Sequence, residues 1–139
     1  MATANVDINF KNDVASRAGG ERVLNCFLCG TCTAGCPISE LEDDFNPRRI
    51  MRQILAGHKD DVLSGGEIWR CYQCHTCVAH CPQDVRFADI IRVLREMSAE
   101  EGKCDPKLPE KVEKLNEKHR KELLKEVNDI ISSKKKAKK

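Results

Sequence analysis

The distribution of apolar residues predicts a chain built mainly from helices. The clearest helix spans residues 47–56, where apolar side chains repeat at helical spacing: Ile50, Met51, Ile54 and Leu55. Asn46 is a favoured N-cap residue, Pro47 suits the first helical position, and Gly57 suits the C-terminal cap. We therefore expect a helix with well-defined ends in the middle of the chain.

A second apolar stripe predicts a longer helix over residues 85–101, capped by Asp84 and packed on the core through Phe87, Ile90, Ile91, Leu94 and Met97. Short helices are expected at residues 21–25 and again shortly before Cys71. In the second of these, Ser64-x-x-Glu67 resembles a capping box. Both short elements would lead the chain into cysteine-rich stretches.

An N-terminal arm is predicted at residues 1–20. Val6, Ile8 and Phe10 alternate with polar neighbours, which favours a short strand or an extended docking segment. A central domain would then occupy residues 21–103.

A C-terminal extension is predicted at residues 104–139. It begins with an amphipathic helix over residues 108–131, whose apolar face must pack on its own domain or on a partner. The lysine-rich residues 132–139 are expected to be a disordered, solvated end.

Composition and charge narrow the class of protein. A chain of 139 residues with 4% aromatic residues can form one small domain with a modest hydrophobic core. Residues 107–139 carry 12 Lys or Arg against 6 Asp or Glu, net +6, whereas residues 1–106 carry 12 against 16, net −4.

No stretch approaches about 18 apolar residues and no export signal is recognisable, so we expect a cytoplasmic protein without a membrane span. A lysine-rich end usually serves solubility, and nucleic acid is not an expected partner.

Eight of the nine cysteines form two copies of one spacing, Cys-x2-Cys-x2-Cys-x3-Cys-Pro. The first run contains Cys26, Cys29, Cys32 and Cys36, and the second contains Cys71, Cys74, Cys77 and Cys81. This spacing is typical of proteins that hold two [4Fe–4S] clusters, because three closely spaced thiolates can surround one side of a cube. Electron transfer is therefore the leading interpretation.

The runs resemble those of two-cluster ferredoxins, in which the fourth cysteine of each run ligates the other cluster. This resemblance implies that one cluster is held by Cys26, Cys29, Cys32 and Cys81, and the other by Cys71, Cys74, Cys77 and Cys36. Such an exchange would tie the two halves together, so we expect folding to require both clusters.

Three other uses of cysteine are possible. Structural zinc usually takes separated pairs of ligands, whereas three cysteines here crowd into seven residues twice. Disulfides suit small secreted scaffolds, but the cysteine count is odd. A thioredoxin-like Cys-x-x-Cys needs a βαβ unit, which the pattern does not predict.

Three further residues could contribute to the cysteine chemistry. Cys104 belongs to neither run and is expected to be a free thiol without a role. His75 and His80 lie inside the second run, where all four cysteine positions are filled, so neither is needed as a ligand. A ring N–H near a cluster sulfur could instead raise a reduction potential.

Two cysteine runs separated by a helical insert resemble the α-helical ferredoxin fold. Asn46-Pro47-Arg48 before the middle helix and Ile68-Trp69-Arg70-Cys71 at the second run extend the likeness. Over about residues 21–102 the chain resembles the family formed by the C subunits of heterodisulfide reductase.

This resemblance implies an iron–sulfur relay without a catalytic residue of its own. Electrons would pass from the flavin-containing, electron-bifurcating A subunit to the catalytic B subunit, which carries Cys-Cys-Gly motifs and reduces the coenzyme M–coenzyme B heterodisulfide. The chain itself contains no Cys-Cys-Gly and no flavin-binding glycine fingerprint. Two alternatives are an equivalent relay subunit in sulfur metabolism and a free-standing two-cluster ferredoxin.

Overall fold

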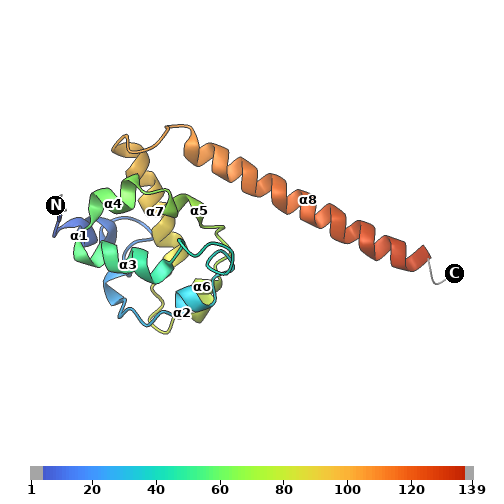
Figure 1. Cartoon of the computed structure of the whole chain (residues 1–139), viewed down its shortest axis with the longest axis horizontal. Coiled ribbons are helices and arrows are strands. Elements are labelled where there is room, and N and C mark those ends of the chain that lie inside the picture. Colours follow the sequence, from blue (N-terminus) through green and yellow to red (C-terminus); the bar gives the residue numbers. More distant parts are fainter. Residues whose placement is uncertain (1–4, 137–139) are drawn as a thin grey trace. The chain divides into compact units, whose positions relative to one another are not determined.

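A computed structural model describes residues 5–136 of the protein, with side chains described to residue 132. Contacts divide the chain into two units, residues 1–106 and residues 107–139. Every regular element in the described range is a helix (Figure 1), which confirms the predicted mainly helical fold. Within the first unit the elements are α1 (Phe10–Ala15), the short 3-10 helix η1 (Val23–Asn25), α2 (Thr31–Ala34), α3 (Pro47–Ala56), α4 (Lys59–Ser64), α5 (Glu67–Arg70), α6 (Thr76–His80) and α7 (Phe87–Glu100).

Helix α3 forms where its end signals predict it. The Asn46 side chain accepts a hydrogen bond from the Arg49 backbone N–H at 3.0 Å, so it satisfies one of the free donors of the first turn. Gly57 ends the helix with φ +84°, a conformation that costs glycine little. The buried face of α3 consists of Pro47, Ile50, Met51 and Ile54.

Helix α7 carries the largest share of the hydrophobic core and contacts α1, α4, α5 and α6 (Figure 1). Its buried apolar residues are Phe87, Ala88, Ile90, Ile91, Val93, Leu94 and Met97. Full burial of each large side chain contributes about 1.5–3 kcal/mol. The core also receives cysteines from both runs, namely Cys26, Cys36, Cys71, Cys77 and Cys81. The core and the cysteine-bearing loops are therefore one packed body.

The predicted cap of α7 is wrong. The helix begins at Phe87 with Arg86 at the N-cap position, and Asp84 makes no capping bond. Residues after Cys81 instead fold around that cysteine, since the Asp84 N–H donates to the Cys81 carbonyl at 3.2 Å. Asp84 also forms an ion pair with Arg22.

The predicted N-terminal arm contains the helix α1, preceded by a turn at residues 8–9, so the strand or extended segment predicted from Val6, Ile8 and Phe10 is wrong. Phe10 and Val14 lie about one turn apart on α1 and are fully buried, whereas Asn12 between them is exposed. In an alternating strand Asn12 would share the buried face of Phe10 and Val14, so this pattern fits a helix. The segment is also tied to the end of α3, because the Asp7 N–H donates to the Gly57 carbonyl at 2.8 Å.

The short helices before the cysteine runs exist, but the capping box does not. Element η1 precedes Cys26 and α5 precedes Cys71, as predicted. Gly66 is the N-cap of α5 without any side-chain cap, and Ser64 belongs to the end of α4.

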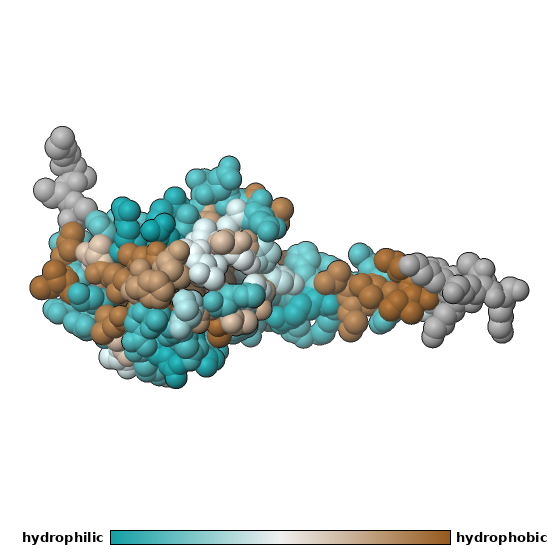
Figure 2. All heavy atoms as spheres, turned by 90° about the horizontal axis from the view of Figure 1, so that it is seen from below, coloured by the Kyte–Doolittle hydropathy of each residue, from teal (hydrophilic) through white to brown (hydrophobic). Residues whose placement is uncertain are grey.

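The second unit contains one long helix, α8 (Leu108–Lys136). It extends past the predicted end at residue 131, so a disordered end from residue 132 is wrong as far as residue 136; residues 137–139 lie outside the described range. Apolar side chains gather toward its C-terminal part (Figure 2), with Leu123, Leu124, Val127, Ile130 and Ile131 all more than 40% exposed. Across the described residues, no helix combines the length and apolar character needed to cross a bilayer.

Candidate functional site

The two cysteine runs fold into the same backbone shape. Each run begins in a loop and enters a short helix, α2 in the first run and α6 in the second. Leu28 and Gln73, each just before the second cysteine, have φ of 60° and 58°. Gly30 and His75, each just after it, have φ of 88° and 60°. The chain therefore contains a structural repeat that the cysteine spacing alone does not reveal.

Backbone strain concentrates at these runs. The five described non-glycine residues with positive φ all lie within a run or just after Cys81: Leu28, Gln73, His75, Asp84 and Arg86. Such a conformation costs about 1–3 kcal/mol per residue and persists only where the surroundings enforce it. Successive right- and left-handed residues turn backbone N–H groups to one side, which creates concave sites for anions, including iron–sulfur clusters.

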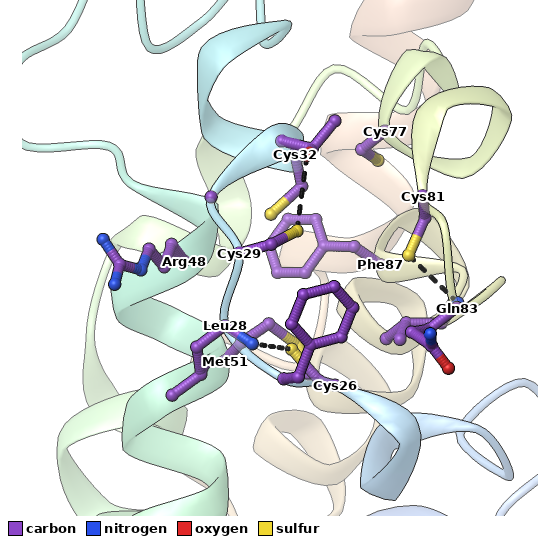
Figure 3. A pocket seen from close by; sticks show the side chains of 14 residues that line it. Cys26, Leu28, Cys29, Cys32, Arg48, Met51, Cys77, Cys81, Gln83 and Phe87 are labelled. Atoms are coloured by element: carbon purple, nitrogen blue, oxygen red, sulfur yellow. Dashed lines mark hydrogen bonds between the residues drawn. The ribbon is translucent and has the colours of Figure 1, made fainter.

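The first cavity brings together cysteines from both runs. Cys26, Cys29 and Cys32 approach from the first loop and α2, and Cys81 approaches from the end of α6 (Figure 3). Leu28, Met51, Val85 and Phe87 supply much of its apolar lining.

The second cavity repeats this arrangement with the runs exchanged. Its cysteines are Cys71, Cys74 and Cys77 from the second run and Cys36 from the first. Cys77 and Phe87 line both cavities, and α2 contacts α6. The two cavities are therefore neighbours, separated by little more than these side chains.

Hydrogen bonds to sulfur occur around both cavities. In the first, the N–H groups of Leu28 and Val85 donate to Cys26 Sγ and Cys81 Sγ, both at 3.4 Å. In the second, Gln73 Nε2 lies 3.5 Å from Cys71 Sγ. These donors stabilise negative charge on sulfur, as an electron-carrying cluster requires.

Threonine hydroxyls accompany the most exposed cysteines. Thr31 Oγ1 lies 3.3 Å from Cys29 Sγ, and Thr76 Oγ1 lies 3.4 Å from Cys74 Sγ. Hydrogen bonding by Thr31 lowers the pKa of the Cys29 thiol. The hydroxyl therefore favours the thiolate, the form that binds metal.

Burial has the opposite effect on the interior cysteines. It raises the pKa of Cys26, Cys32 and Cys71, and it raises the pKa of Cys77 to about 12. These thiols are protonated at neutral pH unless a metal displaces the proton, so metal binding would release protons.

The donor set fits iron–sulfur chemistry. All nine cysteines are free thiols, so none is used in a disulfide. Within the part of the chain that the structure describes, no three His, Cys, Asp or Glu side chains converge on one ion position. The thiols instead line two adjoining cavities that share Cys77, and each cavity offers at least the four thiolates that a cube with one thiolate per iron needs. The cavities also have apolar walls and N–H donors.

Of the three other residues considered from the sequence, His75, His80 and Cys104, only His75 lines a cavity. His75 lines the second cavity and contributes its left-handed backbone at the start of α6, whereas a role for its ring stays a prediction. His80 is exposed at the end of α6 and lines neither cavity. Cys104 follows α7 in the chain and precedes α8, and it lines neither cavity.

Two contributors to the site had no clear signal in the sequence. Phe87 appears as an ordinary core residue in the α7 stripe, yet it lines both cavities. Gln73 looks like a polar filler within a run, yet its amide reaches both Cys71 Sγ and the Ala88 carbonyl.

Comparison with known proteins agrees with this geometry. Residues 22–85 match the family described as "4Fe-4S dicluster domain". The chain is 34% identical, over 73% of its length, to the C subunit of the H(2):CoB-CoM heterodisulfide,ferredoxin reductase of Methanothermobacter thermautotrophicus, and covers 54% of that protein. It is 38% identical, over 70% of its length, to the second iron–sulfur C subunit of the CoB--CoM heterodisulfide reductase of Methanocaldococcus jannaschii, and covers 55% of that protein.

The chain thus spans slightly more than half the length of these two relatives. A further relative, 41% identical over 56% of this chain, is the C2 subunit of the H(2)/formate:CoB-CoM heterodisulfide,ferredoxin reductase of Methanococcus maripaludis, of which the chain covers 41%. The repeated runs, the adjoining cysteine cavities and these matches lead to one conclusion. The chain belongs to the helical 4Fe-4S dicluster family that includes the C subunits of heterodisulfide reductase.

Proposed function

We propose that this chain binds two [4Fe–4S] clusters and transfers electrons within an oxidoreductase complex of the heterodisulfide reductase type. Cys26, Cys29, Cys32 and Cys81 would hold one cluster, and Cys71, Cys74, Cys77 and Cys36 the other. The observation that carries the proposal is that each cavity is lined by the first three cysteines of one run and the fourth of the other, with Cys77 lining both cavities. When bound, each cluster accepts and donates one electron at a time.

The residues of the chain give these clusters their environment. Apolar side chains such as Met51 and Phe87 exclude water from the cavities, which strengthens electrostatic interactions inside them. Backbone donors at Leu28 and Val85 direct hydrogen bonds to sulfur. The shared wall formed by Cys77 and Phe87 supports direct transfer between neighbouring clusters. No residue is assigned as an acid, a base or a nucleophile.

The names of the relatives describe subunits of CoB-CoM heterodisulfide reductases, which supports a place for this chain in a complex with other subunits. By this relationship, the chain would receive electrons from the flavin-containing, electron-bifurcating A subunit of such a complex. It would deliver them to the catalytic B subunit with its Cys-Cys-Gly motifs, where the heterodisulfide is reduced.

A heterodisulfide-reductase-like complex of sulfur metabolism is the alternative setting, and a free-standing ferredoxin is the second. The apolar side chains exposed on α8 favour a role within a complex over a free-standing carrier, because a soluble monomer gains nothing from exposing them. Leu123, Leu124 and Val127 are 59%, 62% and 41% exposed.

Anaerobic purification of the protein from its native source tests the proposal. We expect about eight iron atoms per chain, a brown protein with broad absorption near about 400 nm, and co-purification of a flavoprotein and a Cys-Cys-Gly protein. A colourless chain with zinc would contradict the cluster assignment. An iron-loaded chain that elutes as a monomer would favour the ferredoxin instead.

A further inference from the structure

Arg95, on α7, holds the segment that leads into the second cysteine run. Its Nε donates to the Ile68 carbonyl at 2.8 Å, and its Nη2 donates to the carbonyls of Trp69 and Cys71 at 3.2 and 2.8 Å. The guanidinium carbon also lies 5.3 Å from the centroid of the Trp69 ring, within cation–π range. These bonds satisfy carbonyls that the short helix α5 leaves without partners.

The charge of Arg95 has no carboxylate partner within the described chain, which is unusual for a cation taken partly out of water. Its hydrogen bonds all go to neutral carbonyls, and its side chain is partly buried. Three backbone carbonyls and the face of Trp69 hold this partly buried cation, so its positive charge stays beside the backbone of Cys71.

The arginine near the first cavity is placed differently. Arg48 lines that cavity but is exposed, and its guanidinium points away from the sulfurs (Figure 3). Water and salt screen an exposed charge, whereas a charge inside a low-dielectric body is screened much less. The two halves therefore differ in the strength of the positive field at their cysteines.

We infer that Arg95 is a positioning residue that raises the reduction potential of the cluster held by Cys71, Cys74, Cys77 and Cys36, through its fixed positive charge beside Cys71. This inference rests on the proposed binding of two clusters. Reduction adds one electron, and hence one negative charge, to the cluster beside Arg95. A nearby cation stabilises that reduced form more than the oxidised form, so the potential rises.

The test is an EPR-monitored redox titration of the full-length chain, purified anaerobically with its iron. Arg95→Gln removes the charge but keeps an N–H donor for the carbonyls. Arg95→Lys keeps the charge but loses the planar guanidinium group, which can donate to several carbonyls at once. Arg92→Gln is the matched control, since it removes the same charge one turn earlier on α7 from a side chain that is 61% exposed. Cys74→Ser, which alters one ligand of the second cavity, identifies the EPR signal of that cluster.

We expect Arg95→Gln to disfavour reduction of the second cluster by about tenfold, a downward shift of about 59 mV for one electron, without moving the first cluster. Arg95→Lys should restore most of the shift, and Arg92→Gln should move neither potential. Unchanged potentials in an Arg95→Gln protein with full iron content would overturn the inference. An Arg95→Lys protein with the same lowered potential as Arg95→Gln would also overturn it. The change in potential would then come from the lost hydrogen bonds of the guanidinium group and not from its charge.

Two outcomes separate this inference from the proposed function. A wild-type chain with a single cluster or with no iron refutes the proposed function itself. If Arg95→Gln and Arg95→Met both lose the second cluster while Arg95→Lys keeps it, Arg95 is an anchor for the cluster, and the tuning role is refuted.

Discussion

The two cysteine runs have the same backbone but different surroundings. Both use a left-handed residue before and after the second cysteine, and both then enter a short helix. The first run uses Gly30 where the second uses His75. Outside the runs, Arg48 near the first cavity is exposed, whereas Arg95 beside Cys71 is partly buried. The comparison shows that the repeated backbone of the two runs determines where the thiols lie. The residues around each run determine the electrostatic environment of its thiols.

The largest expected effect tests the exchange between the runs. Replacing Cys36 by Ala should abolish the cluster in the second cavity although Cys36 belongs to the first run, because Cys36 lines that cavity together with Cys71, Cys74 and Cys77. Because the exchange ties the two halves together, the yield of folded protein should fall, and the fraction that still folds should contain about half of the iron and lack one of the two EPR signals. Cys81→Ala should abolish the other signal, since Cys81 lines the first cavity.

Cys104→Ala is the matched control for these substitutions, because Cys104 lies outside both cavities. It should leave iron content and both signals unchanged. If Cys36→Ala instead removed the cluster of Cys26, Cys29 and Cys32, each run would hold its own cluster, and the exchanged assignment would be wrong.

Both ends of α3 could be predicted from the sequence, because their causes are local. Asn46 and Gly57 end α3 through bonds and dihedral angles that depend on their own side chains. The left-handed conformations of Leu28, Gln73 and His75 could not be predicted, since non-glycine residues seldom adopt that region even where, as for histidine, they tolerate it better than most. They are imposed by the packing of the runs against the core, which is a tertiary effect.

The errors of the sequence analysis have the same origin. Asp84 is a good N-cap residue, but its segment folds back on Cys81 and the helix begins later. Phe10 and Val14 fit an alternating strand and a helix equally well, and only the exposure of Asn12 between them distinguishes the helix. The role of Arg95 depends on carbonyls more than 20 residues away in the chain, which no local pattern encodes.

Substitutions at Gly30 and His75 should change the stability of the chain by smaller amounts and in opposite directions. Gly30→Ala should destabilise the chain by about 1 kcal/mol, because an L-residue is strained at φ +88°. The cost should be mainly conformational, since the nearest atom to an added Cβ is Arg48 Cδ at 3.5 Å, an ordinary contact. His75→Gly should remove such strain and stabilise the chain by up to about 1 kcal/mol. Anaerobic urea unfolding, followed by cluster absorbance, measures both changes.

Gly66→Ala is the control for the glycine substitution, because Gly66 has φ −71° and nothing lies within 4 Å of an added Cβ. It should change the urea midpoint less than Gly30→Ala does. Equal destabilisation by His75→Gly and Gly30→Ala would mean that the ring of His75 matters more than its backbone, and that the two loops are not equivalent.

The smallest effect concerns an ion pair that joins the two halves outside the cavities. Arg17, ahead of the first run, binds Glu100, after the second, with Nη2 and Oε2 2.6 Å apart. The hydrogen bond from Arg17 lowers the pKa of Glu100, so this pair stabilises the folded chain above the ordinary carboxyl pKa and is lost as the pH falls through the lowered value. The contribution is small because both side chains are partly exposed, at 34% and 57%.

Glu100→Gln should therefore lower the urea midpoint slightly at neutral pH, and the difference from wild type should vanish in acid. Glu113→Gln on α8 is the control and should show no such pH dependence. A Glu100→Gln deficit that persists unchanged below the ordinary carboxyl pKa would show that packing, not the charge of Glu100, connects α7 to the segment before the first run.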